Sequence, residues 1–305
     1  MTQSVCAAIV TYNPDEATLS NAISALRSQV AAIVIVDNGS QPKARAWLRQ
    51  QQGGPGITVL AQGRNTGVAA AQNQAIHWAR EQGFDFVLIM DQDSVPAADM
   101  VGALRSAWLR LEADGERVGA VGPVPSDPYG GGEMPYFRVT GLRAERIPSD
   151  EIGNDPLRVA YLISSGSLIR LNVFDRVGVM DEGLFIDGVD FDWCFRATAQ
   201  GYGSFLIPTA RLLHTLGDRR RRVWFFGHRE ILQHRPRRLY FMLRNSIIMA
   251  RRPYVPAAWK LYSLRLLVKR LVAFGLLVPP RWDNLRMMLV GILHGVQDRD
   301  GPFPE

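Results

Sequence analysis

Short apolar runs without polar alternation constrain the fold of this chain more than any other feature of its sequence. They occupy residues 6–12, 31–37, 57–62 and 86–90. Between them, apolar residues recur at helical spacing over residues 14–29, 43–50 and 68–83. A strand that is apolar throughout is covered on both faces, and strands that alternate with helices form parallel sheets. The pattern predicts an α/β fold with a Rossmann-like, mostly parallel central sheet flanked by helices.

Polar side chains follow three of these strands at the point where each strand ends. They are Thr11, Tyr12 and Asn13 after the first strand, Asp37 and Asn38 after the second, and Asp91 and Asp93 after the fourth. Ligands of open α/β sheets bind beyond the carboxyl ends of the strands. The sequence therefore predicts a binding site along this edge.

Asp91 and Asp93 lie two residues apart, directly after the apolar run 86–90. Oxygen ligands suit Mg²⁺ or Mn²⁺, which often bind one or two carboxylates together with substrate phosphates. A metal held there could neutralise a diphosphate leaving group. The structural alternative is that Asp93 caps the following helix or shapes a turn.

The companion clusters have the chemistry to read a nucleotide. The carboxylate of Asp37 can accept a hydrogen bond from a base N–H or a ribose hydroxyl. Residues 63–73, which include Asn65 and Gly67, form a glycine-flanked turn before a helix, and helix N-termini favour anions. This turn is neither a dinucleotide fingerprint nor a P-loop. Taken singly, each cluster could be turn chemistry alone.

A second group of carboxylates, Asp187, Asp190 and Asp192, stands in an apolar stretch at the start of a helix expected over residues 190–200. One of them is expected to cap this helix. Close carboxylates in apolar surroundings raise one another's pKa, which suits a general base. The neighbouring Trp193 could stack on a sugar or belong to the core.

The basic residues are concentrated in the C-terminal third. Residues 211–252 contain 12 Arg and two acids, a net charge of +10, whereas residues 1–210 carry 16 basic and 23 acidic residues, or −7. The asymmetry indicates an anionic partner: phosphorylated lipid, an anionic membrane surface, or nucleic acid. A solvated surface is the alternative, and no RNA-binding pattern of aromatic residues is present.

Residues 235–280 predict two helices separated by Pro253 and Pro256. The second helix mixes leucines with basic residues, so it could lie on a membrane or pack against the core. Its longest uncharged apolar run, 271–278, is far shorter than the roughly 20 residues of a membrane span.

The remaining segments suggest the domain organisation. Residues 125–158 are rich in Pro and Gly and predict a long surface loop, followed by an interrupted strand at 159–170. We expect a catalytic domain at 1–218, with halves at about 1–125 and 126–218, and a basic, mostly helical region at 219–305. The N-terminus lacks the features of a signal peptide, and Cys6 and Cys194 match no metal or redox spacing, which suits a cytoplasmic protein.

Together, these motifs resemble the inverting glycosyltransferases of family 2, which have the GT-A fold, and most of all their bacterial rhamnosyltransferase branch. The resemblance extends from about residue 5 to 255. Its motifs, in order, are AAIVTYNP, IVIVDNGS, GRNTGVAAAQNQAI, FVLIMDQDSVP, ISSGSLI, FIDGVDFDWCFRA, HTLGD and RLYFMLRNSI.

The resemblance implies a nucleotide-sugar donor, a divalent metal (Mn²⁺ or Mg²⁺) and transfer with inversion. Asp190 matches the family's catalytic base, Asp93 the more direct metal ligand of the pair with Asp91, and His214 a histidine of the metal or diphosphate site. Asp37 would contact the base or ribose with Thr11, Tyr12, Asn13, Asn38, Asn65 and Gly67, and Asp187 and Trp193 would lie on the acceptor side. Val189 stands where many members have glutamate, and we expect this difference to affect contacts with the acceptor.

The expected activity is transfer of L-rhamnose from dTDP-L-rhamnose to a lipid-linked sugar acceptor of a bacterial surface polysaccharide such as O-antigen, by a protein peripheral to the inner face of the plasma membrane. One alternative is a UDP- or GDP-linked donor. Another is a nucleotidyltransferase, although residues 10–19 lack the glycine-rich loop it needs. A third is a basic adaptor without enzymatic activity.

Overall fold

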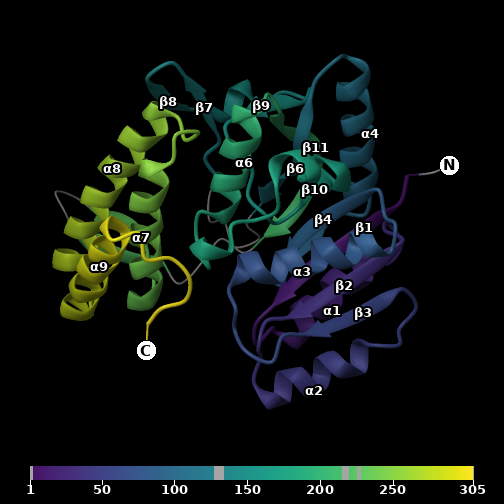
Figure 1. Ribbon diagram of the computed structural model, residues 1–305, viewed down its shortest axis with the longest axis horizontal. Coiled ribbons are helices and arrows are strands. Elements are labelled where there is room, and N and C mark those ends of the chain that lie inside the picture. The colour runs from purple at the N-terminus through teal and green to yellow at the C-terminus, as the bar shows by residue number, and fades with distance from the viewer. Residues whose placement is uncertain (1–2, 127–133, 215–219, 225–227, 305) are drawn as a thin grey trace.

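The computed structural model describes residues 3–126, 134–214, 220–224 and 228–304, with the backbone alone for residues 220–224 and 228–232. Within these residues a nine-stranded sheet forms the centre, with the order β3-β2-β1-β4-β10-β6-β11-β5 and β9 paired to β11. Helices cover this sheet, and three C-terminal helices form a layer at one side of it (Figure 1).

The first half of the sheet is parallel, as predicted. Its strands are β1 (Val5–Thr11), β2 (Ala32–Asp37), β3 (Ile57–Ala61) and β4 (Phe86–Asp91). The helices that connect them are α1 (Glu16–Leu26), α2 (Pro42–Gln51) and α3 (Val68–Glu81). Thr11 pairs in register with Asp37, and Val10 with Asp91. The three polar strand ends therefore lie side by side on one edge.

The second half of the sheet is mixed. It contains β5 (Ser94–Pro96), β6 (Val118–Ser126), β9 (Leu157–Val159), β10 (Ser167–Arg170) and β11 (Gly203–His214), and α4 (Met100–Ala113) precedes β6. β6 and β11 are parallel, whereas β10 is antiparallel to both β4 and β6. The fold class predicted from the sequence is confirmed.

The structure corrects two predictions for the middle of the chain. The segment expected as a loop at 125–158 includes the hairpin β7 (Phe137–Thr140) and β8 (Arg143–Arg146) and a short turn of 3₁₀ helix, Ser149–Glu151. The strand expected at 159–170 is two strands, β9 and β10, because residues 160–166 leave the sheet. Gly166, with φ +84°, faces Pro123 so closely that an added Cβ would be 2.5 Å from its ring, so the chain can turn there only with glycine.

Short helical segments connect β10 to the helix that carries the second carboxylate group. They are Leu171–Val173, α5 (Phe174–Val177) and Glu182–Leu184. The helix α6 (Val189–Ala199) follows, close to the predicted bounds, and β11 leads back into the sheet.

The C-terminal region is helical, with the two predicted helices and a third that the sequence reading missed. They are α7 (Pro236–Arg251), α8 (Ala257–Val272) with a π-helical turn, Ala273–Leu277, and α9 (Arg281–Val296). Before them, β12 (Arg220–Trp224) and β13 (His228–Leu232) pair within the basic tract. No helix among the described residues is long and apolar enough to cross a bilayer.

Two apolar cores connect these parts. The main core of the sheet takes in Ile248 and Met249 of α7 and Trp259 of α8. A smaller core lies among α7, α8, the π-helical turn and α9, with Leu243, Leu267 and Phe274 in it. The predicted division at residue 218 remains a prediction, but the apolar packing continues across it.

Candidate active site

Two carboxylates and an imidazole meet at the end of β4. Asp91, Asp93 and His214 each offer a ligand atom, and these atoms lie within 4.8 Å of one another. His214 is the last residue of β11, and it pairs in register with Ser94 of β5. The sheet topology thus places a residue more than a hundred positions away beside the two aspartates. Carboxylates with one imidazole form a ligand set that fits Mn²⁺ or Mg²⁺.

Buried serines hold this group together. The hydroxyl of Ser94 is 2.6 Å from Nδ1 of His214, and the hydroxyl of Ser165 donates to Oγ of Ser94 at 2.7 Å. The backbone N–H of Asp91 donates in turn to Oγ of Ser165 at 3.2 Å. Such partners fix the orientation of a metal-binding histidine. The role of these serines could not be inferred from the sequence.

The pKa of Asp91 is raised to about 6, first because the carboxyl is removed from water and second because Asp93 lies nearby. His214 and Arg238 lower it in part. Two carboxylates that repel each other in this way are stabilised by a cation.

Gln92, between the two aspartates, connects the ends of β4 and β1. Its Oε1 accepts from the backbone N–H of Tyr12 at 2.7 Å, and its Nε2 donates to the Tyr12 carbonyl at 3.4 Å. The side chain of Tyr12 is left half exposed at the rim. Thr11 is buried and donates its hydroxyl to the carbonyl of Val36 at 3.2 Å, so it joins two strand ends.

Asp37 is buried at the end of β2. Its Oδ1 accepts from the N–H of Ser40 at 2.9 Å, and its Oδ2 lies 3.6 Å from Nε of Arg45 without a hydrogen bond among the described residues. A buried acceptor that lacks a hydrogen bond is costly unless a ligand supplies one. This geometry supports the predicted contact with a base or ribose.

The three predicted asparagines hold the loops around this edge. Oδ1 of Asn13 accepts from the N–H of Gln41 at 2.8 Å, and Oδ1 of Asn38 accepts from that of Thr66 at 2.8 Å. Oδ1 of Asn65 accepts from the N–H of Gly67 at 3.0 Å. Their side-chain oxygens are thus used within the protein, which favours a positioning role.

Gly67 brings the loop after β3 against the second carboxylate group. With φ +94°, it approaches Phe185 so closely that an added Cβ would lie 2.7 Å from the Phe185 carbonyl oxygen. The next N–H, that of Val68, donates to this same oxygen at 2.7 Å. The loop after β3 and the loop before α6 are therefore in direct contact.

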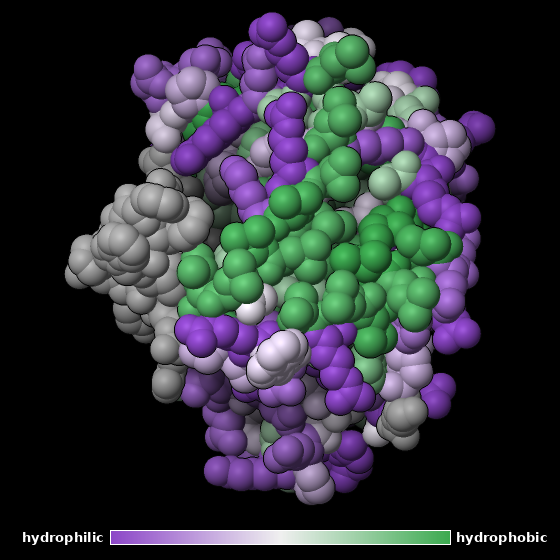
Figure 2. Space-filling view, turned by 90° about the vertical axis from the view of Figure 1, so that its left-hand side faces the viewer, coloured by the Kyte–Doolittle hydropathy of each residue, from purple (hydrophilic) through white to green (hydrophobic). Residues whose placement is uncertain are grey.

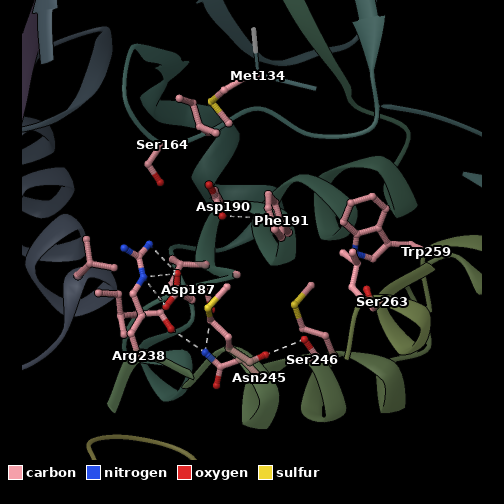
Figure 3. Close-up of a pocket in the computed structure, with 18 of the residues that line it drawn as sticks. Met134, Ser164, Asp187, Asp190, Phe191, Arg238, Asn245, Ser246, Trp259 and Ser263 are labelled. Atoms are coloured by element: carbon pink, nitrogen blue, oxygen red, sulfur yellow. Dashed lines mark hydrogen bonds and ion pairs between the residues drawn. The ribbon is translucent and has the colours of Figure 1, made fainter. Parts of the chain in front are cut away.

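A pocket of about 480 Å³ connects the two carboxylate groups. Asp91, His214, Asp187 and Asp190 all line it, together with residues of α7 and α8. Figure 3 shows Asp187 and Asp190 on its wall. Asp190 stands in the first turn of α6, with Oδ1 accepting from the N–H of Phe191 at 2.9 Å. Its pKa is raised to about 7, mainly because of burial and further by the charges of Asp91 and Asp187, while the Phe191 N–H opposes the shift.

Asp187 is committed to an ion pair on the pocket wall. Arg238 of α7 donates from Nη2 to Oδ1 at 3.0 Å and from Nε to Oδ2 at 3.2 Å. Asp187 has φ +64°, and Asn245 holds this backbone by donating to the carbonyls of Leu184, Ile186 and Asp187 at 2.7 to 2.8 Å. The neighbouring Arg244 donates to the carbonyls of Gly183 and Leu184 at 3.0 Å. The motif RLYFMLRNSI thus supplies the clamp on the loop before α6.

The structure places Asp192 and Trp193 in the core. Trp193 is 1% exposed, donates its indole N–H to the Gly178 carbonyl at 2.9 Å, and packs on Phe174. It does not line the pocket, so its side chain is not positioned to contact an acceptor. The aromatic residues that line the pocket are Phe191 and Trp259, whose rings meet edge to face with centroids 5.7 Å apart.

Arg270 of α8 is a further pocket residue without a role in the sequence analysis. Burial lowers its pKa, and Asp187 opposes that shift, yet no hydrogen bond or ion pair with the described residues engages its guanidinium. A desolvated cation without a bonded counter-ion favours an anionic ligand. The basic tract around residues 217–230 lies largely outside the side chains that the structure describes.

The sheet topology, with a D-x-D pair at the end of β4, is that of the GT-A fold. The sequence matches the glycosyl transferase family 2 model over residues 6–178. The chain therefore belongs to glycosyl transferase family 2.

Individual relatives agree with this assignment. The chain is 32% identical over 295 residues to the dTDP-rhamnosyl transferase RfbF of Shigella flexneri, covering 96% of this chain and 94% of the relative. It is 26% identical to the N-acetylglucosaminyl-diphospho-decaprenol L-rhamnosyltransferase of Mycobacterium tuberculosis, covering 70% and 76% of the two chains. Among solved structures, S. aureus TarS 1–349 in complex with UDP-GlcNAc superposes with a TM-score of 0.58 at 14% identity, over 97% of this chain and 82% of TarS.

Proposed function

We propose that the protein is a metal-dependent inverting rhamnosyltransferase. It would transfer L-rhamnose from dTDP-L-rhamnose to a sugar acceptor carried on a lipid diphosphate, during synthesis of a bacterial surface polysaccharide such as O-antigen. The observation that carries the proposal is one pocket lined by Asp91 and His214 on one side and by Asp190 on the other. The sugar and the lipid-linked acceptor are supported by what the two rhamnosyltransferase relatives are named for.

The donor nucleotide would lie along the ends of β1 and β2. Oδ2 of Asp37, which is buried beside Arg45 without a hydrogen bond, would accept from a base N–H or ribose hydroxyl, and the half-exposed ring of Tyr12 is available for stacking. Asp91, Asp93 and His214 would hold a divalent metal, which supplies positive charge to the diphosphate of the donor.

Asp190 would be the general base. The acceptor hydroxyl gives its proton to the Asp190 carboxylate while its oxygen bonds to the anomeric carbon. The bond from that carbon to the diphosphate oxygen breaks on the opposite face, and the configuration inverts. A base works best with a pKa near the working pH, and the pKa of about 7 meets this condition.

The acceptor would occupy the part of the pocket built by α6, α7 and α8. Phe191 and Trp259 offer apolar surface to a sugar ring, and Arg270 offers its guanidinium to an anionic group. A sugar on a lipid diphosphate has both features. The protein would accordingly act in the cytoplasm, at the inner face of the plasma membrane.

The test is a donor panel followed by transfer. We expect dTDP-L-rhamnose to bind more tightly than UDP- and GDP-hexoses in the presence of Mn²⁺ or Mg²⁺, measured by calorimetry. Transfer to a synthetic acceptor with a diphosphate should then yield the inverted linkage by NMR. Tightest binding of a UDP-hexose would refute the choice of rhamnose and leave the mechanism standing. Release of a sugar 1-phosphate with pyrophosphate would instead indicate a nucleotidyltransferase, and no turnover of any donor an adaptor.

A further inference from the structure

Helix α8 has two opposite functional faces. One face lines the catalytic pocket, and its residues are Trp259, Ser263, Leu266 and Arg270. The other face is exposed, and its residues are Leu261, Leu264, Val268 and Val272. At about 100° of rotation per residue, the two sets are centred on opposite sides of the helix. The packing of α8 therefore explains the first face and leaves the second without a partner among the residues that the structure describes.

Helix α9 extends this exposed face. Its buried side lies so close to α7 that a Cβ added at Gly291 would be 2.5 Å from the Tyr240 carbonyl oxygen. Its outer side exposes Trp282, Leu289, Leu293 and Val296, again along one face of the helix. Trp282 is 81% exposed, and Leu276 in the turn between the helices is 65% exposed. Figure 2 shows one broad apolar area on this side of the molecule, bordered by hydrophilic residues.

The charged residues of α8 and α9 themselves are almost all positive. Residues 257–296 contain six basic residues and a single acid, Asp283, and α8 contains no carboxylate at all. On α8 the helical rotation places Lys260 along one edge of the exposed leucines and Arg265 and Lys269 along the other. An apolar stripe between basic edges is the pattern of a helix that lies in a membrane interface. An exposed tryptophan suits the same level of the bilayer.

We infer that the outer faces of α8 and α9, which we call the docking face, bind the surface of a bilayer that contains anionic lipid. The alternative occupant is a second copy of the chain. A two-fold interface through this face would bring the basic edges of the copies together, with only Asp283 of this segment to offset them. The charge of the face therefore favours phospholipid.

The docking face would also bring the acceptor within reach, a point that rests on the proposed function. A helix with its side chains is about 10 Å thick. With the outer face of α8 on the lipid headgroups, its inner face, and so Arg270 on the pocket wall, stands about one helix diameter from the membrane surface. A sugar on a lipid diphosphate projects into this zone.

The experiment measures binding of the full-length protein to vesicles of phosphatidylcholine alone or with 30 mol% phosphatidylglycerol. We expect sedimentation with the anionic vesicles that weakens with salt, because the attraction to basic residues is screened. The double variant Leu264→Glu/Val268→Glu should lower the bound fraction at least tenfold. The matched control is Leu109→Glu, since Leu109 is also exposed but lies on α4, across the molecule from α8 (Figure 1). It should bind as the unmodified protein does.

Two results would overturn the inference. One is the absence of binding of the unmodified protein to anionic vesicles at low salt. The other is a dimer in sedimentation velocity that the double variant converts to a monomer, together with equal vesicle binding by both proteins. Thermal unfolding of each variant separates loss of fold from loss of binding. Transfer to a water-soluble acceptor needs no membrane, so it tests the proposed function separately and should be the same in the double variant.

Discussion

Asp190 and Asp192 stand two residues apart in α6, but their asparagine variants should have different defects. Asp192→Asn should lower the stability of the fold and keep the activity, whereas Asp190→Asn should lose the activity and keep the fold. Asp192 is fully buried, and Tyr254 donates to its Oδ1 at 2.6 Å and Arg196 to its Oδ2 at 3.1 Å. Arg252 bridges Asp192 and Asp181. No side chain among the described residues donates to Asp190, whose carboxylate accepts from the backbone N–H of Phe191.

The loss of stability expected for Asp192→Asn follows from the buried charge of Arg252, which would lose one of its two carboxylate partners. Burial alone would lower the pKa of Arg252, and the carboxylates of Asp192 and Asp181 more than offset this. Removing one partner of a buried ion pair costs about 3 to 5 kcal/mol. Asp181 stays with Arg252, so we expect about 3 kcal/mol, or a fall in melting temperature of about 5 °C for a chain of 305 residues. Activity per folded molecule should remain close to that of the unmodified enzyme.

Asp190→Asn should instead abolish transfer and leave the fold intact. Loss of a general base costs a factor of about 10² to 10⁴ in rate. The assay pairs thermal unfolding of both variants with transfer rates below their melting temperatures and with donor binding by calorimetry. Full transfer by Asp190→Asn would end the base assignment. Equal melting temperatures for Asp192→Asn and the unmodified protein would refute the stabilising role of the ion-pair cluster.

Further predictions concern pH, metal and acceptor. Transfer should rise as the pH rises through about 7 and then level off, because the base must be ionised; a flat profile of kcat/KM from pH 5.5 to 8.5 would contradict this. The pKa of Asp190 is raised in the folded protein, so ionisation of Asp190 destabilises the fold as the pH rises towards about 7. Asp190→Asn should therefore melt at a higher temperature than the unmodified protein at pH 8 but not at pH 4. Chelation should stop transfer, and added Mn²⁺ should restore it. Ser94→Ala should weaken Mn²⁺ binding about 10- to 100-fold in calorimetry, because Ser94 orients His214. Unchanged affinity would refute this role of Ser94. Arg270→Gln should raise the KM of a diphosphate acceptor at least tenfold with donor affinity unchanged, whereas the exposed Arg281→Gln should change neither; an equal effect on an uncharged acceptor would argue against an anion at Arg270.

The parts of the fold that the sequence predicted are those with local signals. β1, β2 and β4 are apolar runs with polar residues directly at their ends, and β3 is interrupted only by Thr58, so β1 to β4 and the edge with Asp37 and Asp91 could be located without coordinates. The hairpin β7–β8 and the strand β9 were missed because Pro and Gly dominate their segment. Their pairing depends on distant partners, as β9 pairs with β11.

The residues of the site that were missed act through contacts remote in sequence. Ser165 reaches Ser94, Asn245 reaches the loop before α6, and Arg270 reaches the pocket from a helix that the sequence allowed to lie on a membrane or on the core. One signal was visible in the sequence: in α7, an arginine and an asparagine stand next to each other among apolar residues. Two adjacent polar residues on a core face need partners, and here Arg244 and Asn245 find them in backbone carbonyls.

These remote contacts argue that the C-terminal helices are part of the active site. Phe185 accepts the N–H of Val68 from the donor side and stacks on Phe241 of α7 with ring centroids 5.0 Å apart. A single residue thus touches the start of α3 and the helix that clamps the loop before Asp190. α8 packs on α7, on α6 and on the hairpin β7–β8, and it carries the docking face on its other side. A displacement at the membrane would therefore reach the pocket through packed side chains. Removal of residues 257–305 should therefore open the acceptor wall and expose the main core at Trp259, and we do not expect residues 1–256 to retain transfer.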